Sequence, residues 1–437
     1  MAKVLIVGAG AAGLMAAGAA VRQGHQVTVL EHMDKPGQKI LVTGKGRCNV
    51  TNDCPAEEFL RHVRTNPRFL YSSLGAFPPA KTMELFEGLG VELKVERGRR
   101  VFPVSDKAEE IRQALLRYAQ DAELVHDGAK KLLLEEVTPE PEAAPAAPEN
   151  PRHPKKKKAG PALRCIGVRG TSGREYRADA VLVATGGVSY PTTGSTGDGY
   201  RIARDLGHEI VPPCGSLVPL VSGDDACRRM QGLALKNVEL TALTGKNKVQ
   251  FRDFGELLFT HFGVSGPLVL SASAHLRDWD KHSYRLVIDL KPALDREKLE
   301  ARILRDLGEN PNRDFEKILA GLVPHSMVPV ILERLEIPAG LKANSVTKAQ
   351  RRALEELLKG FTVSVTGPRP VAEAIVTSGG VKVNQVQPST MESKLTPGLY
   401  FAGEILDVDA YTGGFNLQIA WSTGHLAGTS AAVAEGE

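Results

Sequence analysis

The first 31 residues carry the pattern that most restricts how this chain can fold. An apolar run at residues 4–7 leads directly into the sequence Gly-Ala-Gly-Ala-Ala-Gly at residues 8–13, and a helix-prone segment follows. A second apolar run, residues 27–30, ends at the acidic residue Glu31. This order predicts a strand, a tight turn, a helix and a second strand parallel to the first.

The spacing of the three glycines gives each a separate role. Gly8 permits the sharp bend out of the strand. Gly10 lets the backbone approach a phosphate, and Gly13 lets the helix pack closely on the sheet. A strand-helix-strand unit whose glycines only form a turn is the plain alternative.

The start of the predicted helix and the end of the second strand complete the pattern. The helix offers its first backbone N–H groups and a positive dipole to a pyrophosphate, which makes Ala11 and Ala12 candidate contacts beside the glycines. Glu31 stands where an acid accepts hydrogen bonds from ribose hydroxyls. Together these features predict dinucleotide binding.

Composition restricts the class of protein without identifying it. The chain has 437 residues, of which 42% are hydrophobic and 24% charged, enough for two or three globular domains. Its net charge of +4 is compatible with a nucleic-acid partner but does not indicate one. Apolar runs of membrane-spanning length are always interrupted by glycine turns, so we expect no membrane span.

The cysteines and the N-terminus bear on the compartment. The five cysteines are odd in number and scattered along the chain, which favours a reducing cytoplasm over a disulfide framework. The apolar N-terminus has glycines and no basic segment beyond Lys3, unlike a signal peptide. We therefore expect a cytoplasmic protein.

A loop rich in glycines and cations, residues 37–52, is the second informative stretch. Its glycines, Gly44 among them, let backbone N–H groups face a ligand. Lys39 and Arg47 supply charge for a phosphate or a reduced flavin, and Asn49 can bond to a ring edge. The alternative is a surface loop that binds nothing.

Cys48 is open to three interpretations. Arg47 beside it would lower the thiol pKa and make the cysteine a proton donor. A redox disulfide with Cys54 is less favoured, because five residues separate the pair whereas flavin disulfide reductases have four. A purely structural cysteine is the third interpretation.

Two further glycine-rich segments follow later in the chain. One is the apolar strand that runs into Thr185 and Gly186, which suits close passage beside an adenosine. The other lies near the C-terminus, where Gly403 and Glu404 precede a glycine pair that opens a last helix. Its candidate cofactor contacts are Gly414, Phe415 and Asn416.

Together the glycine segments suggest FAD held between the two ends of one domain. Only one complete dinucleotide fingerprint occurs, so NADH or NADPH would have to dock transiently as electron donor.

The remaining sequence predicts a split α/β nucleotide-binding domain with a middle insertion that is part β and part α. Helices are expected over 56–90, 295–358 and 415–434, and a strand over 371–383. A segment rich in Pro, Ala and Glu, residues 138–160, is expected to be disordered. Its lysine run, residues 155–158, is either a solvated tip or a basic tether for an acidic partner.

Several long motifs resemble the BaiN/RdsA-like flavoproteins, also known as the aminoacetone-oxidase-type FAD-binding family. The matching segments are 37–52, 98–108, 184–200, 255–267 and 376–428. Thr43 and Lys45 stand where Ser and Gly are expected, and Ala410 where Gly is expected.

The resemblance implies a split Rossmann-like FAD-binding domain of the two-dinucleotide-binding type. It also implies an inserted β-barrel-like domain and a small helical subdomain. The expected boundaries are 1–190 with 369–437 for the FAD-binding domain, 191–294 with 360–368 for the β-rich domain, and 295–359 for the helical subdomain.

Activities in the family include reduction of a steroid C=C bond, oxidation of an aminoketone, and reduction of uridine to dihydrouridine in ribosomal RNA. We expect an FAD-dependent oxidoreductase that uses NAD(P)H to reduce a conjugated C=C bond, with a small molecule or ribosomal RNA as substrate. The alternatives are an aminoketone oxidase and a non-catalytic flavin-bearing protein that binds RNA or ribosomes.

The resemblance and the loop chemistry give four candidate catalytic residues, Cys48, Arg47, His261 and Tyr411, with Lys45 as an alternative to Arg47. Cys48, His261 and Tyr411 are candidate proton donors. Arg47, or Lys45 near it, would stabilise negative charge on the substrate carbonyl.

Overall fold

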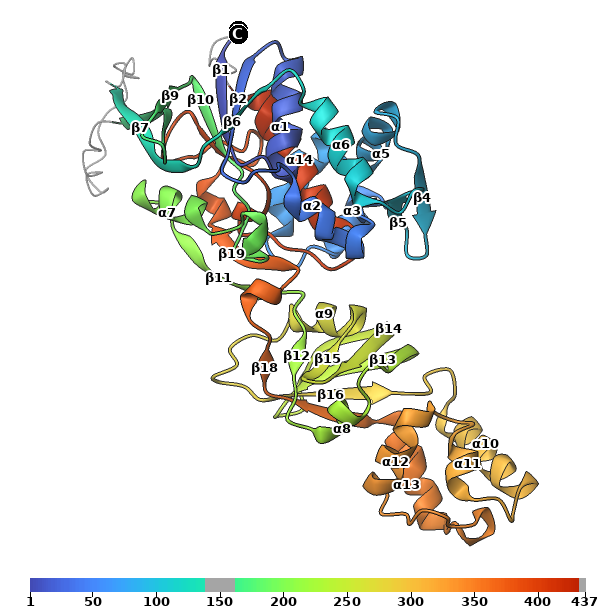
Figure 1. Cartoon of the computed structure of the whole chain (residues 1–437). Helices are drawn as coiled ribbons and strands as arrows, with labels where there is room; N and C mark the ends of the chain where they lie inside the picture. Colours follow the sequence, from blue (N-terminus) through green and yellow to red (C-terminus); the bar gives the residue numbers. More distant parts are fainter. Residues whose placement is uncertain (138–161, 432–437) are drawn as a thin grey trace, which may run out of the picture. The chain divides into compact units, whose positions relative to one another are not determined.

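The structure is a computed structural model that describes residues 1–137 and 162–431. The predicted insertion at 138–160 and the last residues of the predicted closing helix lie outside the described residues. The chain forms two compact units (Figure 1). Unit 1 comprises Met1–Cys214 and Val376–Glu437, and unit 2 comprises Gly215–Ile375.

The chain passes from unit 1 to unit 2 and back again, and both boundaries lie later in the sequence than predicted. Residues 191–214 belong to unit 1, because Tyr200 and Ala203 are buried in its core. Residues 369–375 belong to unit 2, where the Ile375 N–H donates to the Leu217 carbonyl at 3.2 Å.

Unit 1 is built on a five-stranded parallel sheet in the order β20-β10-β1-β2-β6. Its strands are β1 (Lys3–Val7), β2 (Gln26–Glu31), β6 (Glu123–His126), β10 (Ala180–Val183) and β20 (Leu399–Phe401). Strand β20 comes from the C-terminal part of the chain and pairs with β10. This pairing confirms that a Rossmann-type α/β sheet is assembled from both ends of the sequence.

Helices α1 (Ala11–Arg22) and α14 (Phe415–Ser430) lie side by side next to this sheet (Figure 1). Small residues allow their close approach. An added Cβ at Gly424 would lie 2.4 Å from the Ala12 carbonyl oxygen, and one at Gly428 would lie 2.4 Å from that of Ala16. The packing of α14 on α1 joins the last described helix of the chain to the first.

The rest of unit 1 consists of small sheets and short helices. Unit 1 also contains three smaller sheets. One is formed by β3 (Thr51–Asn52), β5 (Arg100–Pro103) and β4 (Leu93–Glu96), and a second by β7 (Ala129–Val137), β8 (Ala162–Gly170) and β9 (Glu175–Arg177). The third pairs β11 (Ile210–Ser216) with β19 (Val376–Val381). The helices are α2 (Gln38–Val42), α3 (Ala56–Arg61), α4 (Tyr71–Ala76), α5 (Pro79–Gly88), α6 (Ala108–Tyr118) and α7 (Asp198–Asp205).

Two of the predicted elements are shorter than expected. The helix predicted over 56–90 is divided into α3, α4 and α5 with a 3₁₀ turn at Pro67–Leu70, because Pro67, Pro78 and Pro79 restrict the helix at these points. The strand predicted over 371–383 is confined to β19.

Unit 2 contains a seven-stranded antiparallel sheet in the order β17-β16-β13-β14-β15-β12-β18. The strands are β12 (Leu220–Val221), β13 (Ala234–Thr244), β14 (Val249–Thr260), β15 (Gly263–Ser265), β16 (Tyr284–Asp289), β17 (Phe361–Val365) and β18 (Gly367–Pro368). The helices are α8 (Asp225–Arg229), α9 (Pro267–Ser273), α10 (Arg296–Glu309), α11 (Phe315–Leu319), α12 (Val328–Arg334) and α13 (Lys348–Lys359).

The helical segment and the sheet of unit 2 share one hydrophobic core. Leu299 on α10, Leu354 on α13 and Phe361 on β17 are fully buried in the same cluster. The structure therefore groups as one unit what the sequence predicted as two domains, and a barrel-like shape for the sheet stays a prediction.

No helix within the described ranges is both long and apolar enough to cross a membrane.

Candidate cofactor site

The carboxyl ends of β1, β2, β10 and β20 lie along one edge of the parallel sheet of unit 1, because the four strands run in the same direction. This edge contains the turn after Val7 and Glu31, the last residue of β2. It also contains residues 184–187 and 402–404, which follow β10 and β20. Ligands of open parallel sheets bind at this edge. The fold thus brings together four of the segments predicted to contact the cofactor.

The three glycines of the first turn have different surroundings. Gly8 has φ +100°, and an added Cβ would lie 2.7 Å from the Ala184 carbonyl oxygen. A Cβ at Gly13 would lie 1.9 Å from the Gly8 carbonyl oxygen. At Gly10 a Cβ would meet no heavy atom within 4 Å. The fold requires Gly8 and Gly13, whereas the open space at Gly10 suits close approach of a ligand to the backbone.

Helix α1 begins without compensation for its dipole. Gly10 is the N-cap residue, no described side chain caps the helix, and its first turn contains no acidic residue. The first N–H groups of a helix have no partner inside the helix. This end of α1, which starts at Ala11 and Ala12, is therefore suited to an anion such as a pyrophosphate.

Glu31 fixes the glycine turn to the end of β2. Its carboxylate accepts a hydrogen bond from the Ala9 N–H at 2.7 Å and another from the Met33 N–H at 2.9 Å. The side chain is buried, with 9% of the residue exposed. Because each carboxylate oxygen accepts more than one hydrogen bond, Glu31 keeps the capacity to bind a ribose hydroxyl.

A polar network joins the loop after β2 to the C-terminal segment. The Lys39 ammonium donates to Glu404 Oε2 at 2.6 Å and to Ser189 Oγ at 2.7 Å. Glu404 Oε1 accepts from Ser189 Oγ at 3.0 Å and from the Thr377 N–H at 2.7 Å. Thr377 Oγ1 in turn accepts from the N–H groups of Val188 and Ser189 at 2.9 and 3.1 Å. Four segments distant in sequence are thereby held in one arrangement.

The start of α14 is built on the loop of residues 49–52. Gly413 and Gly414 have φ of +122° and +98°, and a Cβ at Gly414 would lie 2.3 Å from the Thr51 carbonyl oxygen. Asn49, in the amide orientation that satisfies its hydrogen bonds, accepts from the Gly414 N–H at 2.9 Å and donates to the Thr51 carbonyl at 3.1 Å. Asn49 therefore positions α14, whose first turn contains no acidic residue and no capping side chain among the described residues.

Two predicted cofactor contacts on α14 have structural side chains. Phe415 is 3% exposed and stacks on His62 with ring centroids 4.5 Å apart. The Asn416 amide accepts from the Ala410 N–H at 2.9 Å and donates to the carbonyls of Ala410 and Tyr411 at 2.8 and 3.2 Å. These side chains hold the loop before α14, so only their backbone groups remain as candidate cofactor contacts.

Glycines again account for the close packing after β10 and β20. Thr185 Oγ1 is buried without a hydrogen-bond partner among the described residues and faces α7, since a Cβ at Gly199 would lie 2.1 Å from it. Gly186 has φ +74° with Ser195 Oγ 2.9 Å from an added Cβ, and Gly403 has φ +77° with the Ala12 Cβ at 2.8 Å. The predicted contact through the Thr185 side chain is thus not supported.

Arg47 is bound by carboxylates instead of facing a ligand. Its guanidinium donates to Asp106 Oδ1 at 2.8 Å through Nε, pairs with Glu96, and stacks on the Phe102 ring at 4.1 Å. The hydrogen bonds that Arg47 donates to Glu96 and Asp106 raise the pKa of its guanidinium. Its charge is therefore compensated, contrary to the expectation that it stabilises a flavin or a substrate carbonyl.

Cys48 has no exposed surface, and burial raises the pKa of its thiol to about 12. The hypothesis that Arg47 lowers this pKa is wrong, because desolvation dominates. Cys48 and Cys54 are both free thiols. The structure therefore supports the structural interpretation of Cys48 over the proton donor and the redox disulfide.

The strained loop that contains Cys48 departs from the family pattern at one informative position. Gly44, Lys45 and Cys48 have φ of +56°, +60° and +58°. At Gly44 an added Cβ would lie 2.9 Å from the Asn49 N atom. Lys45 holds a left-handed conformation at the position where the family pattern predicts glycine.

The other two catalytic candidates lie in different units. Tyr411 is half-buried in unit 1, where its N–H donates to the His62 carbonyl at 3.0 Å. His261 is exposed in unit 2, at the turn between β14 and β15, with its ring edge-on to Phe262.

Sequence reasoning missed Ser189 and Thr377 as members of the site. Thr377 is fully buried in β19, an apolar strand otherwise interrupted by Ser378 and two glycines. The available signal for a polar site was the presence of two hydroxyl residues and a glycine pair within one buried strand. The hydrogen-bond partners of Thr377, on residues 188–189 and Glu404, could not be predicted because the fold alone brings them together.

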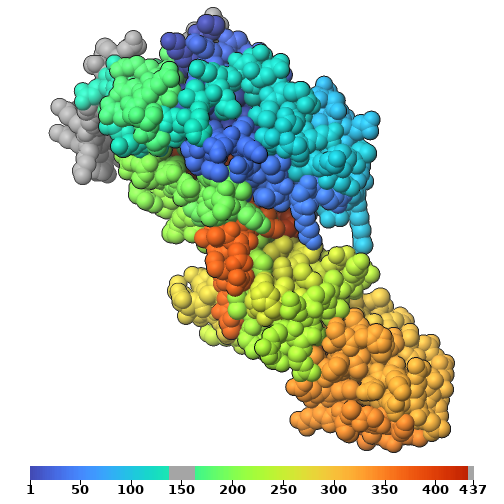
Figure 2. All heavy atoms as spheres, in the orientation of Figure 1, coloured from blue at the N-terminus to red at the C-terminus, as the bar shows by residue number. Residues whose placement is uncertain are grey.

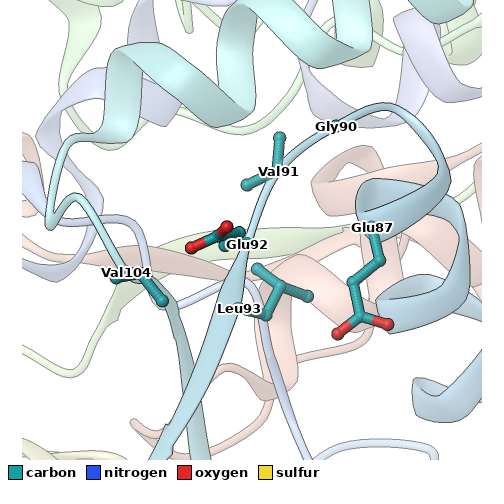
Figure 3. A pocket seen from close by; sticks show the side chains of 6 residues that line it. All are labelled: Glu87, Gly90, Val91, Glu92, Leu93 and Val104. Carbon is teal, nitrogen blue, oxygen red and sulfur yellow. The ribbon is translucent and has the colours of Figure 1, made fainter.

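A hollow of about 530 Å³ lies elsewhere in unit 1, between α5 and the β4–β5 hairpin (Figure 3). Its lining includes the carboxylates of Glu87 and Glu92 and the apolar side chains of Val91 and Leu93. None of the candidate cofactor or catalytic residues lines it. Within residues 1–137 and 162–431, no group of three or more His, Cys, Asp and Glu side chains is arranged to hold a metal ion.

Comparison with known proteins identifies the family. Residues 2–135 and 156–430 match the family described as "HI0933-like protein Rossmann domain". The chain belongs to this family of flavoprotein oxidoreductases. The match confirms the resemblance deduced from the sequence motifs, and it covers both units.

Three curated relatives of the family resemble the chain along nearly its whole length. The 3-dehydro-bile acid delta(4,6)-reductase of Clostridium scindens is 30% identical over 99% of each chain. The ribosomal RNA dihydrouridine synthase of Haemophilus influenzae is 31% identical over 98% of this chain and 97% of its own. The enzyme of the same name from Escherichia coli is 30% identical over 96% and 95%.

Proposed function

We propose that unit 1 binds FAD at the carboxyl edge of its parallel sheet. One observation carries this proposal: three features lie together at this edge. Helix α1 starts without a capping side chain among the described residues, Gly10 faces open space, and the buried carboxylate of Glu31 binds the Ala9 N–H beside them. These groups fit a dinucleotide: the helix start suits the pyrophosphate, and Glu31 suits the adenosine ribose. The Lys39–Glu404 network and the start of α14 would complete the site from the C-terminal side.

An FAD held by these residues would supply hydride-transfer chemistry between NADH or NADPH and a substrate. The chain's own contribution is to hold the cofactor and to stabilise charge near it. The start of α14, without an acidic residue in its first turn, supplies a positive dipole. Lys45 is exposed on the loop of residues 37–52. Because Arg47 on the same loop is already paired with carboxylates, Lys45 is our proposed cation for stabilising a substrate carbonyl.

We propose reduction of a C=C bond conjugated to a carbonyl as the reaction, with uridine in ribosomal RNA as the substrate. Two of the relatives named above are ribosomal RNA dihydrouridine synthases, and both are covered over at least 95% of their length. Formation of dihydrouridine saturates the C5=C6 bond next to the C4 carbonyl. The mildly basic net charge of +4 agrees with this substrate.

A small conjugated ketone is the second candidate substrate. The bile acid reductase is as similar to this chain as the RNA-modifying relatives. Its name describes the same bond chemistry, a ketone conjugated with C=C bonds. Both candidates therefore require hydride delivery to one carbon and a proton to its neighbour.

Tyr411 and His261 remain our proposed proton donors. Tyr411 lies on the loop that Asn416 holds ahead of α14, close to the proposed cofactor site. His261 is accessible on unit 2. The variants Tyr411→Phe and His261→Gln, made separately, should both leave flavin reduction by NAD(P)H unchanged. The variant that lacks the proton donor should reduce the substrate more slowly than wild type.

The deciding experiment begins with the purified full-length protein and its flavin spectrum. Anaerobic bleaching by NADH and by NADPH identifies the electron donor. The reduced protein is then offered ribosomal RNA, a conjugated enone or oxygen, and dihydrouridine is detected by the mass gain of two hydrogens. Dihydrouridine supports the leading proposal, and turnover of the enone alone supports the second. Peroxide release with an aminoketone in the absence of NAD(P)H indicates an oxidase, and protein that ignores added FAD overturns the cofactor assignment.

A further inference from the structure

We infer that the turn between β4 and β5 is a phosphate-binding contact for RNA. This turn, hereafter the arginine turn, consists of Arg97, Gly98, Arg99 and Arg100. The inference rests on the proposed RNA substrate and adds a place where that RNA is held. Figures 1 and 2 show the β4–β5 hairpin at the margin of unit 1, and all three arginines are exposed.

The backbone of the arginine turn is fixed. Glu96 pairs with Arg100 across the hairpin, and the chain reverses through Gly98 and Arg99, both with positive φ, at +77° and +58°. The Arg99 carbonyl accepts from the Asp53 N–H at 2.8 Å. A non-glycine residue in this conformation is uncommon, so Arg99 restricts the path of the backbone through the turn.

The charge of the arginine turn is only partly compensated. Arg97 has no ion-pair partner among the described residues, and the Arg100 Nε donates only to the Arg97 carbonyl, at 3.0 Å. Glu96, opposite Arg100, interacts with it electrostatically but is bound to Arg47. Arg99 pairs with Glu58 at 2.7 Å but remains 54% exposed. Like charges this close repel one another, and an external anion would relieve the repulsion.

One buried amide connects the arginine turn to the proposed cofactor site. Asn52 Nδ2 donates to the Gly98 carbonyl at 3.0 Å and to the Gly413 carbonyl at 3.0 Å. Gly413 directly precedes the N-cap of α14. RNA held by the arginine turn would therefore lie next to the segment that faces the cofactor.

The chemistry of the arginine turn fits a phosphate backbone. A guanidinium presents several N–H donors in a planar fork that matches two phosphate oxygens. Such contacts set the position of a nucleic acid without reading its sequence. The arginine turn would thus supply part of the affinity for RNA, while the choice of uridine would be made elsewhere.

The test compares the variant Arg97→Gln/Arg100→Gln with the control Lys130→Gln/Lys131→Gln. Both remove two exposed positive charges from unit 1, and the control lies on β7, away from β4 and β5 (Figure 1). Binding of deproteinised bacterial ribosomal RNA to the full-length holoprotein is measured from 50 to 300 mM salt, and dihydrouridine formation is measured in parallel. We expect the arginine variant to bind about tenfold more weakly at low salt, with a salt slope smaller by about 1.5 for two lost phosphate contacts. The control should match wild type.

Unchanged affinity and salt slope in the arginine variant would overturn the inference while leaving the proposed reaction intact. Weaker RNA binding without any dihydrouridine in wild type would support the arginine turn and remove the proposed substrate. Equal losses in the arginine variant and the control would show a general charge effect and would also overturn the inference. Flavin reduction by NAD(P)H should be the same in all three proteins.

Discussion

The ammonium of Lys39 lies 2.6 Å from the carboxylate of Glu404, although 365 residues separate them in the sequence. Both side chains are about four-fifths buried, and Ser189 bonds to each of them. The pair is thus one direct link between the N-terminal loop and the C-terminal segment of the proposed cofactor site.

Replacing Lys39 by Met should weaken FAD binding. The variant leaves the Glu404 carboxylate without its cation and releases the loop that follows β2. We expect an increase in Kd of at least about tenfold, which corresponds to roughly 1.4 kcal/mol. Quenching of flavin fluorescence during titration of the cofactor-free protein measures the change.

Lys359→Met is the matched control for this variant. Lys359 forms an ion pair of the same length, 2.6 Å, with Asp289 in unit 2, where both side chains are similarly buried. Its loss should leave the Kd for FAD at the wild-type value. An equal effect of the two substitutions would show that Lys39 acts only through general stability.

Substitutions at Gly10 and Gly13 should separate cofactor binding from folding. Gly10→Ala adds a methyl group into open space at an ordinary φ of −82°, so the Tm of the cofactor-free protein should stay within about 2 °C of wild type. FAD binding should nevertheless weaken, because the methyl group lies where the phosphate must approach.

Gly13→Ala should have the opposite profile. The added Cβ would lie 1.9 Å from the Gly8 carbonyl oxygen, so α1 must shift away from the sheet. A loss of about 1–3 kcal/mol in the free energy of unfolding is expected, measured by urea denaturation of the cofactor-free protein. If Gly10→Ala binds FAD as tightly as wild type, the pyrophosphate does not occupy the start of α1.

These glycines also show what the sequence could predict. The first turn and the parallel sheet follow from local spacing, because the strand, glycine turn and helix are adjacent in the chain. The positions of Gly8, Gly13 and Glu31 in the fold were predictable for the same reason. The roles of long side chains were not.

Arg47 and Asn416 illustrate the limit. Each has the right chemistry for a ligand contact, but each side chain is held by other groups of the protein. Glu96 and Asp106 bind Arg47, and the loop at Ala410 takes up the Asn416 amide. The carboxylates that bind Arg47 are 49 and 59 residues away in the sequence, so only the folded chain reveals them. The partners of Asn416 are five and six residues away and depend on the conformation of that loop.

Cys48→Ala should not affect catalysis. The thiol is fully buried, so it cannot reach a substrate, and its removal should cost about 1 kcal/mol of stability through lost packing. Stopped-flow measurement of substrate reduction should give the wild-type rate. A slower rate with unchanged flavin bleaching would restore Cys48 as the proton donor.

Thiol reactivity gives an independent check on Cys48. Cys214 is the exposed cysteine, whereas burial raises the pKa values of Cys48 to about 12 and of Cys54, Cys165 and Cys227 to about 11. A thiol reagent at pH 8 should therefore modify Cys214 in the native protein and the other cysteines only after unfolding. Rapid native modification of Cys48, located by peptide mass, would contradict its burial.

His208 should make unit 1 sensitive to acid. The residue is 2% exposed, and burial lowers the pKa of its imidazole from 6.5 to about 4. Below pH 6.5 the unfolded chain takes up a proton that the folded protein does not, so the free energy of unfolding falls as the pH decreases to about 4. The loss from this group amounts to on the order of 3 kcal/mol, and it does not grow below that pH.

The variant His208→Gln isolates this contribution, since glutamine does not titrate and can still bond to Ser393, the partner of the imidazole at 2.9 Å. Urea unfolding of unit 1, followed between pH 7 and pH 4, should show a shallower pH dependence in the variant than in wild type. His325→Gln, at an exposed position in unit 2, should leave the wild-type slope. Parallel curves for wild type and His208→Gln would mean that the buried imidazole is protonated as readily as an exposed one, in conflict with its position against Phe401 in the core.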